Sequence, residues 1–235
     1  MDIKYIIEQL NLKKDERINK IYCKDNPSLE IIGVKMKDIR ALAKDIGINH
    51  GLAIKLYDQE IYETMMLSTL IADHHQITNS LITSWVKRAH QSPIIDQGLS
   101  HFFLKVNSYD ELLKTWCLSN DDDLRYAGFS LLSTYFRLEA LTHIKTDFGI
   151  DMLSKIEDTI VKQPPRIQNA MNNAVVMAGL HVPDLVEKAY ETAKKIGYIL
   201  PLKAKNSCNI QSALDYLDRY ITQPKYSRVA KIRTK

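Results

Sequence analysis

The sequence predicts an all-α protein, an α-solenoid of degenerate helical repeats with a concave face. Three observations support this fold class: apolar residues recur with helical periodicity along almost the whole chain, no segment alternates convincingly as a strand, and the predicted helices are joined by short links. Helices of about 10 to 16 residues pair into units of about 35 to 45 residues, the period of HEAT-type repeats. Because no copy shares a clear signature with the next, an irregular helical bundle is the alternative.

Each predicted helix follows from its own apolar pattern. The segment 61–71 is apolar nearly all round, so we expect a central helix there. A stripe from Ile167 to Ala178 predicts an amphipathic helix that begins at Pro164-Pro165 and ends at Gly179. Comparable stripes predict further helices over 81–89, 112–117, 124–135, 185–193 and 210–221.

Composition indicates a soluble globular protein. The chain has 235 residues, of which 45% are hydrophobic and 26% charged. No apolar run is long enough for a membrane span, and residues 1–10 lack the apolar core of a signal peptide, so we expect a cytoplasmic protein without a membrane partner. Cys23, Cys117 and Cys208 lie far apart, which favours reduced thiols over disulfides or a zinc site.

Charge separates the end of the chain from its body. The net charge is +4, and the five basic residues of 225–235, with no acid among them, leave residues 1–224 at −1. We therefore expect a single repeat domain over 1–224 and a basic C-terminal tail over 225–235. The tail suits contact with phosphates, with a flexible solubilising terminus as the alternative.

Signatures of cofactor or metal chemistry are missing, since the sequence has no P-loop, dinucleotide fingerprint, nucleophile–His–acid spacing or ligand cluster. We expect no cofactor and no metal. His74 and His75 are adjacent and would point about 100° apart on a helix, which favours a helix-end pair over a shared ion. For Glu63 we expect a buried ion pair, with a site carboxylate as the alternative. Trp85 and Trp116 lie on apolar stripes and are expected in the core.

Several segments carry a family resemblance, in the same order as in the family. They are GVKMKDIRALAK at Gly33 to Lys44, the pair Tyr62-Glu63, the triplet Ala127-Gly128-Phe129, and 167–173. Together they resemble the AlkD-type DNA alkylation repair family of HEAT-like repeat proteins, over about residues 33–221. The resemblance implies an α-solenoid that holds DNA on a basic concave face, and its better-known members are DNA glycosylases that remove cationic alkylated purines such as 3-methyladenine.

The family's chemistry explains which residue types its site needs. A cationic purine is a good leaving group, so the enzyme stabilises the positive charge that develops on the deoxyribose, with a carboxylate and with aromatic faces. The resemblance places Asp96 at the carboxylate position and Ser92 where the family has a tryptophan; Asn173 and Val176 stand for a second Trp and its Arg. For Asp96 the alternative is an early-helix acid favoured by the helix dipole.

The positions that contact phosphates in the family also carry different residues in this sequence. Tyr126 stands where the family carries an arginine, with Arg125 displaced by one residue, and three acids at 121–123 would repel phosphates. We favour solvated polar positions for Asn172 and Asn173, with contact to DNA bases or sugars as the alternative. The candidate DNA contacts are Arg125, Tyr126, Asn173, Arg228, Lys231 and Arg233.

The missing tryptophans decide the predicted function. Base–aromatic stacking contributes about 1 to 3 kcal/mol per base, so the absence of two indole rings could slow excision roughly 30-fold to 10⁴-fold. We therefore expect a divergent, DNA-associated or repair-related member with little or no base-excision activity. The alternatives are an active alkylpurine DNA glycosylase that uses Asp96, and a scaffold that binds an unknown protein partner. Because repeat proteins close their own core, we expect a monomer.

Overall fold

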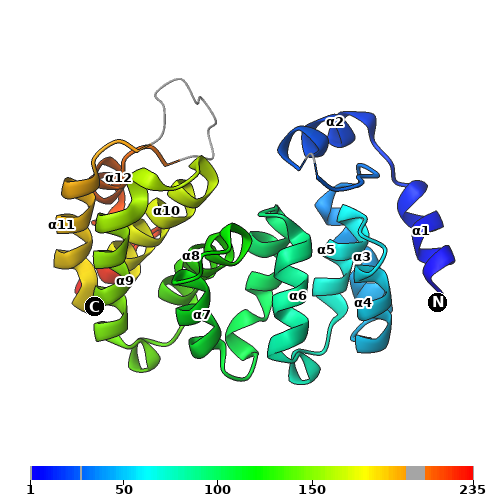
Figure 1. Ribbon diagram of the computed structural model, residues 1–235, viewed down its shortest axis with the longest axis horizontal. Helices are drawn as coiled ribbons and strands as arrows, with labels where there is room; N and C mark the ends of the chain where they lie inside the picture. Colours follow the sequence, from blue (N-terminus) through cyan, green and yellow to red (C-terminus); the bar gives the residue numbers. More distant parts are fainter. Residues whose placement is uncertain (1, 27, 200–209, 235) are drawn as a thin grey trace. The chain divides into compact units, whose positions relative to one another are not determined.

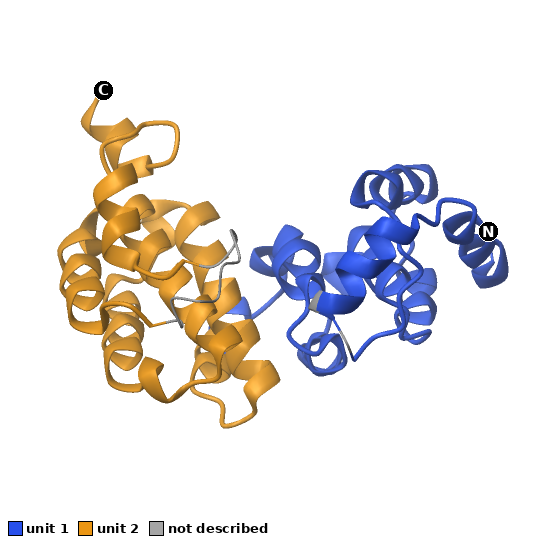
Figure 2. Cartoon of the chain, turned by 90° about the horizontal axis from the view of Figure 1, so that it is seen from above, with its two compact units in different colours: residues 1–112 blue, residues 113–235 orange. Residues whose placement is uncertain are grey.

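The computed structural model describes residues 2–26, 28–199 and 210–234. Helices are the only regular elements in these ranges, which contain isolated β-bridges but no strand, so the all-α prediction is confirmed. No helix in this part of the chain is both long and apolar enough to cross a membrane. The chain divides into two compact units, Met1–Leu112 and Leu113–Lys235 (Figure 2). We predicted one domain over 1–224; the boundary between the units falls inside a helix, α7 (Tyr109–Cys117), and not in a linker.

Unit 1 is built around α5 (Tyr62–Ile71), the predicted central helix (Figure 1). Nine of its ten residues are buried, and it packs against two neighbouring helices and the π-helical turn η2 (Ile94–Gly98). The other helices of unit 1 are α1 (Ile3–Asn11), α2 (Glu16–Asp25), α3 (Met36–Ile46), α4 (His50–Tyr57), η1 (His74–Gln76), α6 (Asn79–Ala89), η3 (Leu99–His101) and η4 (Phe103–Lys105).

Glu63 is fully buried at the start of α5, but among the described residues it has no partner for the ion pair that we predicted. Its carboxylate accepts hydrogen bonds from three consecutive backbone N–H groups, those of Ile32 (2.9 Å), Gly33 (2.7 Å) and Val34 (3.1 Å). Charge-assisted bonds of this kind offset the cost of burying a carboxylate. The side chain therefore fixes the segment that leads into α3.

Gly33 is required in that segment for two reasons. Its φ of +98° lies in a region that L side chains rarely adopt, and a Cβ atom there would lie 2.6 Å from Cβ of Asn19. Asn19 in turn donates from Nδ2 to the carbonyl of Ile31 at 2.7 Å. The segment is thus held on one side by α2 and on the other by α5.

Unit 2 is organised around α10 (Pro165–His181), which packs against α8 (Asp122–Leu138) along most of its length (Figure 1). The prolines begin α10 as predicted, but the helix runs two residues beyond Gly179, the predicted end. A Cβ at Gly179 would lie 2.6 Å from Cδ2 of Leu217, so close packing explains this glycine. The remaining helices are η5 (Leu141–His143), α9 (Thr146–Thr159), η6 (Ile160–Lys162), η7 (Pro183–Leu185), α11 (Val186–Ile196), α12 (Ala213–Tyr220) and α13 (Arg228–Arg233).

A buried glutamate also links two helices of unit 2. Glu157 of α9 accepts hydrogen bonds from Lys188 (2.7 Å), Thr192 (2.7 Å) and Lys195 (2.9 Å) of α11. Burial by itself would raise the pKa of Glu157, but these three donors outweigh it and lower the pKa to about 2. The carboxylate therefore stays ionised and holds α11 against α9.

Candidate nucleic-acid interface

Asp96 and Ser92, for which the resemblance predicted the places of the family's carboxylate and tryptophan, lie in and just before η2 of unit 1. Asp96 is exposed, and its backbone carbonyl accepts a hydrogen bond from Ser100 Oγ at 2.6 Å. Ser92 is only 1% exposed, and its Oγ accepts from the backbone N–H of Ile94 at 3.3 Å. The position that the resemblance assigns to a tryptophan therefore holds a small buried side chain, which accepts a hydrogen bond from the start of η2 and offers no surface for a base.

Neither tryptophan of the chain can replace the missing one. Trp85 is 0% exposed and stacks on Tyr57, with the ring centroids 4.3 Å apart and the planes at 3°. The hydroxyl of Tyr57 donates to the backbone carbonyl of Trp85 at 2.6 Å, which fixes the pair. Trp116 is 1% exposed. The prediction that both indoles belong to the core is confirmed.

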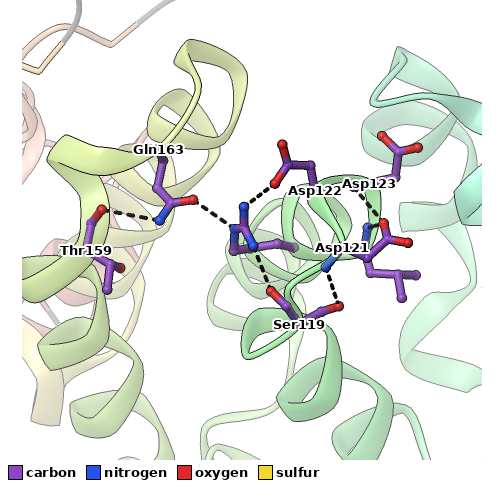
Figure 3. Close-up of polar contacts among 8 residues, drawn as sticks. Ser119, Asp121, Asp122, Asp123, Thr159 and Gln163 are labelled. Atoms are coloured by element: carbon purple, nitrogen blue, oxygen red, sulfur yellow. Dashed lines mark hydrogen bonds and ion pairs between the residues drawn. The ribbon is translucent and has the colours of Figure 1, made fainter.

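Arg125, predicted to contact DNA, uses its guanidinium inside unit 2. Nε donates to Oε1 of Gln163 at 2.8 Å, Nη1 donates to the carbonyl of Ser119 at 2.8 Å, and Nη2 pairs with the carboxylate of Asp122. Figure 3 shows Gln163 between this network and Thr159, whose carbonyl accepts from Gln163 Nε2 at 3.3 Å. The network ties the start of α8 to the end of α9.

The acidic run 121–123 is partly neutralised by the same arrangement. Asp121 accepts from the backbone N–H groups of Asp123 and Leu124 as the N-cap of α8, and Asp122 pairs with Arg125 (Figure 3). These interactions account for two of the three adjacent acids, Asp121 and Asp122. The predicted repulsion of phosphates is correspondingly reduced.

Tyr126 and the two asparagines considered as DNA contacts, Asn172 and Asn173 of α10, differ in their surroundings. Tyr126 is 8% exposed, and Asn173 is half-buried. Asn172 is fully buried, so the solvated position that we favoured for it is wrong. Its Nδ2 donates to the carbonyl of Ile210 at 2.6 Å, while Oδ1 of Asn169 accepts from the N–H of Ile210 at 3.2 Å. These two hydrogen bonds anchor the chain just before α12.

Residues 228–233, in the predicted basic tail, form a helix that packs on the body of unit 2. Val229 and Ala230 are buried, and Ser227 Oγ donates to the carbonyl of Leu180 at 2.9 Å. Arg228 donates to the backbone carbonyls of Glu139 (2.8 Å) and Arg137, which lie at the end of α8. The alternative of a flexible terminus is therefore wrong for the described residues 225–234, since apolar burial and capping hold this segment in place.

The basic residues of this region surround His181. Burial, followed by the positive charges of Arg228, Arg137 and Lys231, lowers the pKa of His181 to about 4. Lys231 and Arg233 are exposed and can meet phosphates, whereas Arg228 is committed to the α8 carbonyls. Asp96 belongs to unit 1, and the candidate contacts Arg125, Tyr126, Asn173, Arg228, Lys231 and Arg233 all belong to unit 2.

Asp73, His74 and His75 approach one another more closely than the sequence indicated. In the short η1 turn their potential ligand atoms lie within 4.8 Å, and the two histidine rings are 4.1 Å apart, so the argument from diverging helical side chains is wrong. However, Oδ1 of Asp73 accepts from the N–H of His75 and Oδ2 accepts from Gln76. Capping of η1 accounts for this cluster, and the absence of a metal stays a prediction.

The sequence interpretation overlooked one group of residues. Tyr216 and Tyr220 of α12 lie next to Tyr226, and Arg219 and Lys225 stand beside their rings. Two tyrosines four residues apart with an arginine between them were the available signal, because positions i and i+4 share a helix face.

The chain is similar to a known protein family, to two relatives from Listeria and to a solved structure. Residues 6–217 match the family described as DNA alkylation repair enzyme. Uncharacterized proteins of Listeria monocytogenes and Listeria innocua are each 24% identical over 195 residues, which cover 82% of this chain and 84% of theirs. The chain is also similar to a solved structure, with a TM-score of 0.87 and 25% sequence identity. The similarity covers 97% of this chain and 98% of the other. That structure is described as a new family of proteins related to the HEAT-like repeat DNA glycosylases with affinity for branched DNA structures. This similarity confirms the predicted helical solenoid of HEAT-like repeats.

Proposed function

The chain belongs to the DNA alkylation repair enzyme family, and we propose that within this family it binds DNA, with a preference for branched structures, and excises damaged bases little or not at all. The observation that carries the proposal is Ser92, which is 1% exposed at the position where the resembling glycosylases have a tryptophan. A buried serine cannot stack on a purine. The two tryptophans of the chain are also buried, so neither indole is available to grip a damaged base.

DNA binding is supported by charge and by the structural relative. Lys231 and Arg233 are exposed on α13, in a segment with no acidic residue. Each phosphate contact would release condensed counterions, so such residues give an affinity that falls steeply with salt. The similar solved structure comes from a family with affinity for branched DNA, which is why we propose branched DNA as the ligand.

The test is a titration of fluorescently labelled DNA with the full chain, followed by anisotropy. We expect a four-way junction to bind more tightly than a linear duplex of equal length, and the affinity for both to fall as salt increases. Absence of binding at low salt, or binding that does not depend on salt, would exclude this function and favour the protein-binding scaffold.

One observation favours an alternative. Asp96 is exposed on η2, and the glycosylase resemblance implies a carboxylate beside the sugar at this position. An active alkylpurine DNA glycosylase would release 3-methyladenine or 7-methylguanine from methylated duplex, and Asp96→Asn would abolish the release. Release that survives Asp96→Asn would exclude this role for the carboxylate.

The cellular setting is part of the same proposal. Cys23 and Cys117 are free, and burial raises the pKa of the Cys117 thiol, which keeps it protonated and unreactive. These properties suit the reducing cytoplasm. We propose a cytoplasmic monomer that needs no cofactor; Cys208 lies outside the described residues.

A further inference from the structure

Three tyrosine side chains form a cluster on the C-terminal part of unit 2. The ring centroids of Tyr216 and Tyr220 are 4.8 Å apart with planes at 50°, and those of Tyr220 and Tyr226 are 4.8 Å apart with planes at 62°. Tyr216 and Tyr220 come from α12, and Tyr226 comes from the turn before α13. The cluster therefore combines rings from two neighbouring elements.

Two of these tyrosines are partly exposed to water. Tyr216 is 37% exposed and Tyr226 is 44% exposed, whereas Ala213 and Leu217 of the same region are 0% exposed and provide the apolar packing of α12. Exposed large apolar surface gathered in one place marks a binding surface more often than scattered exposed residues do. The packing of unit 2 thus leaves part of the surface of these tyrosines exposed to solvent.

Positive charge accompanies the rings. The guanidinium carbon of Arg219 lies 6.0 Å from the ring centroid of Tyr220, and Nζ of Lys225 lies 5.1 Å from that of Tyr226. Residues 212–234 contain five basic residues and two acids. Both acids are hydrogen-bonded to tyrosines, Asp215 to the hydroxyl of Tyr198 at 2.7 Å and Asp218 to Tyr190. The charge of the region therefore favours an anionic partner.

We propose that Tyr216, Tyr220 and Tyr226 bind unpaired nucleobases by stacking, while Arg219 and Lys225 contact the adjoining phosphates. Aromatic side chains interleaved with basic ones are the usual means of holding single-stranded nucleic acid, because every base has a π-face. Bases within a duplex are already stacked on their neighbours and present no free face. This inference rests on the proposed DNA binding and specifies a further feature that some branched DNAs offer, namely the unpaired bases of a fork, which a fully paired four-way junction lacks.

The test compares two DNA probes and two pairs of variants. The probes are a forked duplex with two unpaired oligothymidine arms and a fully paired duplex of the same length. Tyr216→Leu with Tyr226→Leu retains apolar volume but removes two stacking rings, and Tyr216→Phe with Tyr226→Phe retains the rings. Tyr5→Leu is the matched control, since Tyr5 is 45% exposed and belongs to unit 1.

We expect the leucine pair to weaken binding of the fork at least about fivefold, which corresponds to removing the stacking of one base at the low end of its range. Its affinity for the paired duplex should be unchanged, and the phenylalanine pair and Tyr5→Leu should bind the fork like the wild type. Replacing thymidine in the arms by 5-iodouracil should give photo-crosslinks to Tyr216 or Tyr226, a result that a purely structural role would not produce.

The outcomes separate this inference from the function on which it rests. If the wild type binds neither probe, the proposed function fails. If the wild type binds the fork but the leucine pair binds it equally well, or no crosslink maps to residues 216–226, the tyrosines do not recognise bases and the inference is overturned, whereas DNA binding stands. Equal weakening of binding to both probes would also overturn it, because stacking on unpaired bases cannot affect the paired duplex.

Discussion

The carboxylate of Glu63 accepts a hydrogen bond from the backbone N–H of Gly33 at 2.7 Å, and this bond joins two segments that carry the family resemblance. Glu63 follows Tyr62 at the start of α5, and Gly33 begins the segment that leads into α3. The two motifs belong together because one supplies the acceptor and the other supplies donors. The resemblance of these two motifs therefore has a structural basis, since together they fix the segment that leads into α3.

Replacing Glu63 should destabilise unit 1 strongly. Glu63→Ala leaves the N–H groups of residues 32–34 buried without their acceptor, at about 1 to 3 kcal/mol for each unsatisfied group. We expect the free energy of unfolding to fall by at least about 3 kcal/mol in urea titrations followed by circular dichroism. Glu8→Ala, at an exposed position of α1, is the control. Equal stability of the two variants would contradict this account of Glu63.

Gly33→Ala should be more harmful than Gly47→Ala. Both glycines have positive φ, +98° and +70°, so both variants strain the backbone by roughly 1 to 3 kcal/mol. Only at position 33 would the new Cβ also meet Asn19, whereas position 47 has nothing within 4 Å. The difference between the two thermal midpoints isolates the effect of this close approach. Similar midpoints would show that the approach to Asn19 is unimportant.

Arg125→Gln should affect stability and leave DNA binding intact. The substitution removes the bonds to Gln163, Ser119 and Asp122, and we expect unit 2 to lose about 1 to 3 kcal/mol. Fluorescence of Trp116 in a Trp85→Phe background reports on this unit. If Arg125 instead contacts phosphate, Arg125→Gln will weaken junction binding and reduce its salt dependence, as the family resemblance implies.

The free energy of unfolding should fall on acidification, first as His181 becomes protonated and then, at lower pH, as Glu157 does. The pKa of His181 is lowered from 6.5 to about 4, so between these values the unfolded chain binds a proton that the folded protein does not. The stability associated with neutral His181 is complete above pH 6.5 and is lost as the pH falls toward about 4. Glu157, with its pKa lowered from 4.5 to about 2, contributes only at lower pH, where its stabilisation is lost below 4.5.

Urea unfolding of the wild type and of His181→Gln at a series of pH values checks that His181 causes the loss of stability between pH 6.5 and about 4. The variant should lose stability less steeply between pH 6.5 and about 4. The stability of the His181→Gln variant should still depend on pH in this range, because His101 is also protonated more readily in the unfolded chain. Burial and the charge of Arg40 lower the pKa of His101 in the folded protein. Identical slopes for the two proteins would show that His181 is not responsible.

Lys231→Gln and Arg233→Gln should each weaken junction binding. Both residues are exposed on α13, and the removal of each positive charge that meets a phosphate should reduce the slope of log K against log salt by about 0.9. Arg228 is unsuitable for this experiment, since its substitution would also free the carbonyls at the end of α8. Lys13→Gln, at an exposed position of unit 1, should leave the slope unchanged. A slope that neither Lys231→Gln nor Arg233→Gln alters would exclude α13 from the interface.

Periodicity predicted the helices well, because a buried apolar stripe is visible in the sequence. The central helix α5 and the core positions of Trp85 and Trp116 followed directly from it. Polar partners were harder to predict. Glu63 and Asn172 bond to backbone groups 29 or more residues away, and nothing in the local sequence identifies such partners.

In the candidate site, too, some features could be predicted from the sequence and others depend on distant segments. Resemblance to the family identified Asp96 and Ser92, but only the structure shows that Arg125 is held by Gln163, 38 residues further on. The basic tail was recognised by its charge, whereas the burial of Val229 and Ala230, which makes it a packed helix, depends on surfaces formed by distant segments. The tyrosine cluster was missed because Tyr226 joins it only through the turn after α12.

The most direct test of the central claim is the release of methylated purines from alkylated duplex DNA by the purified full-length chain. Ser92 is buried, and the resemblance assigns its position to a lesion-binding tryptophan, so we predict that release of 3-methyladenine and 7-methylguanine stays at the level of buffer alone. Release well above that level, and abolished in Asp96→Asn, would contradict the account and establish a working glycosylase.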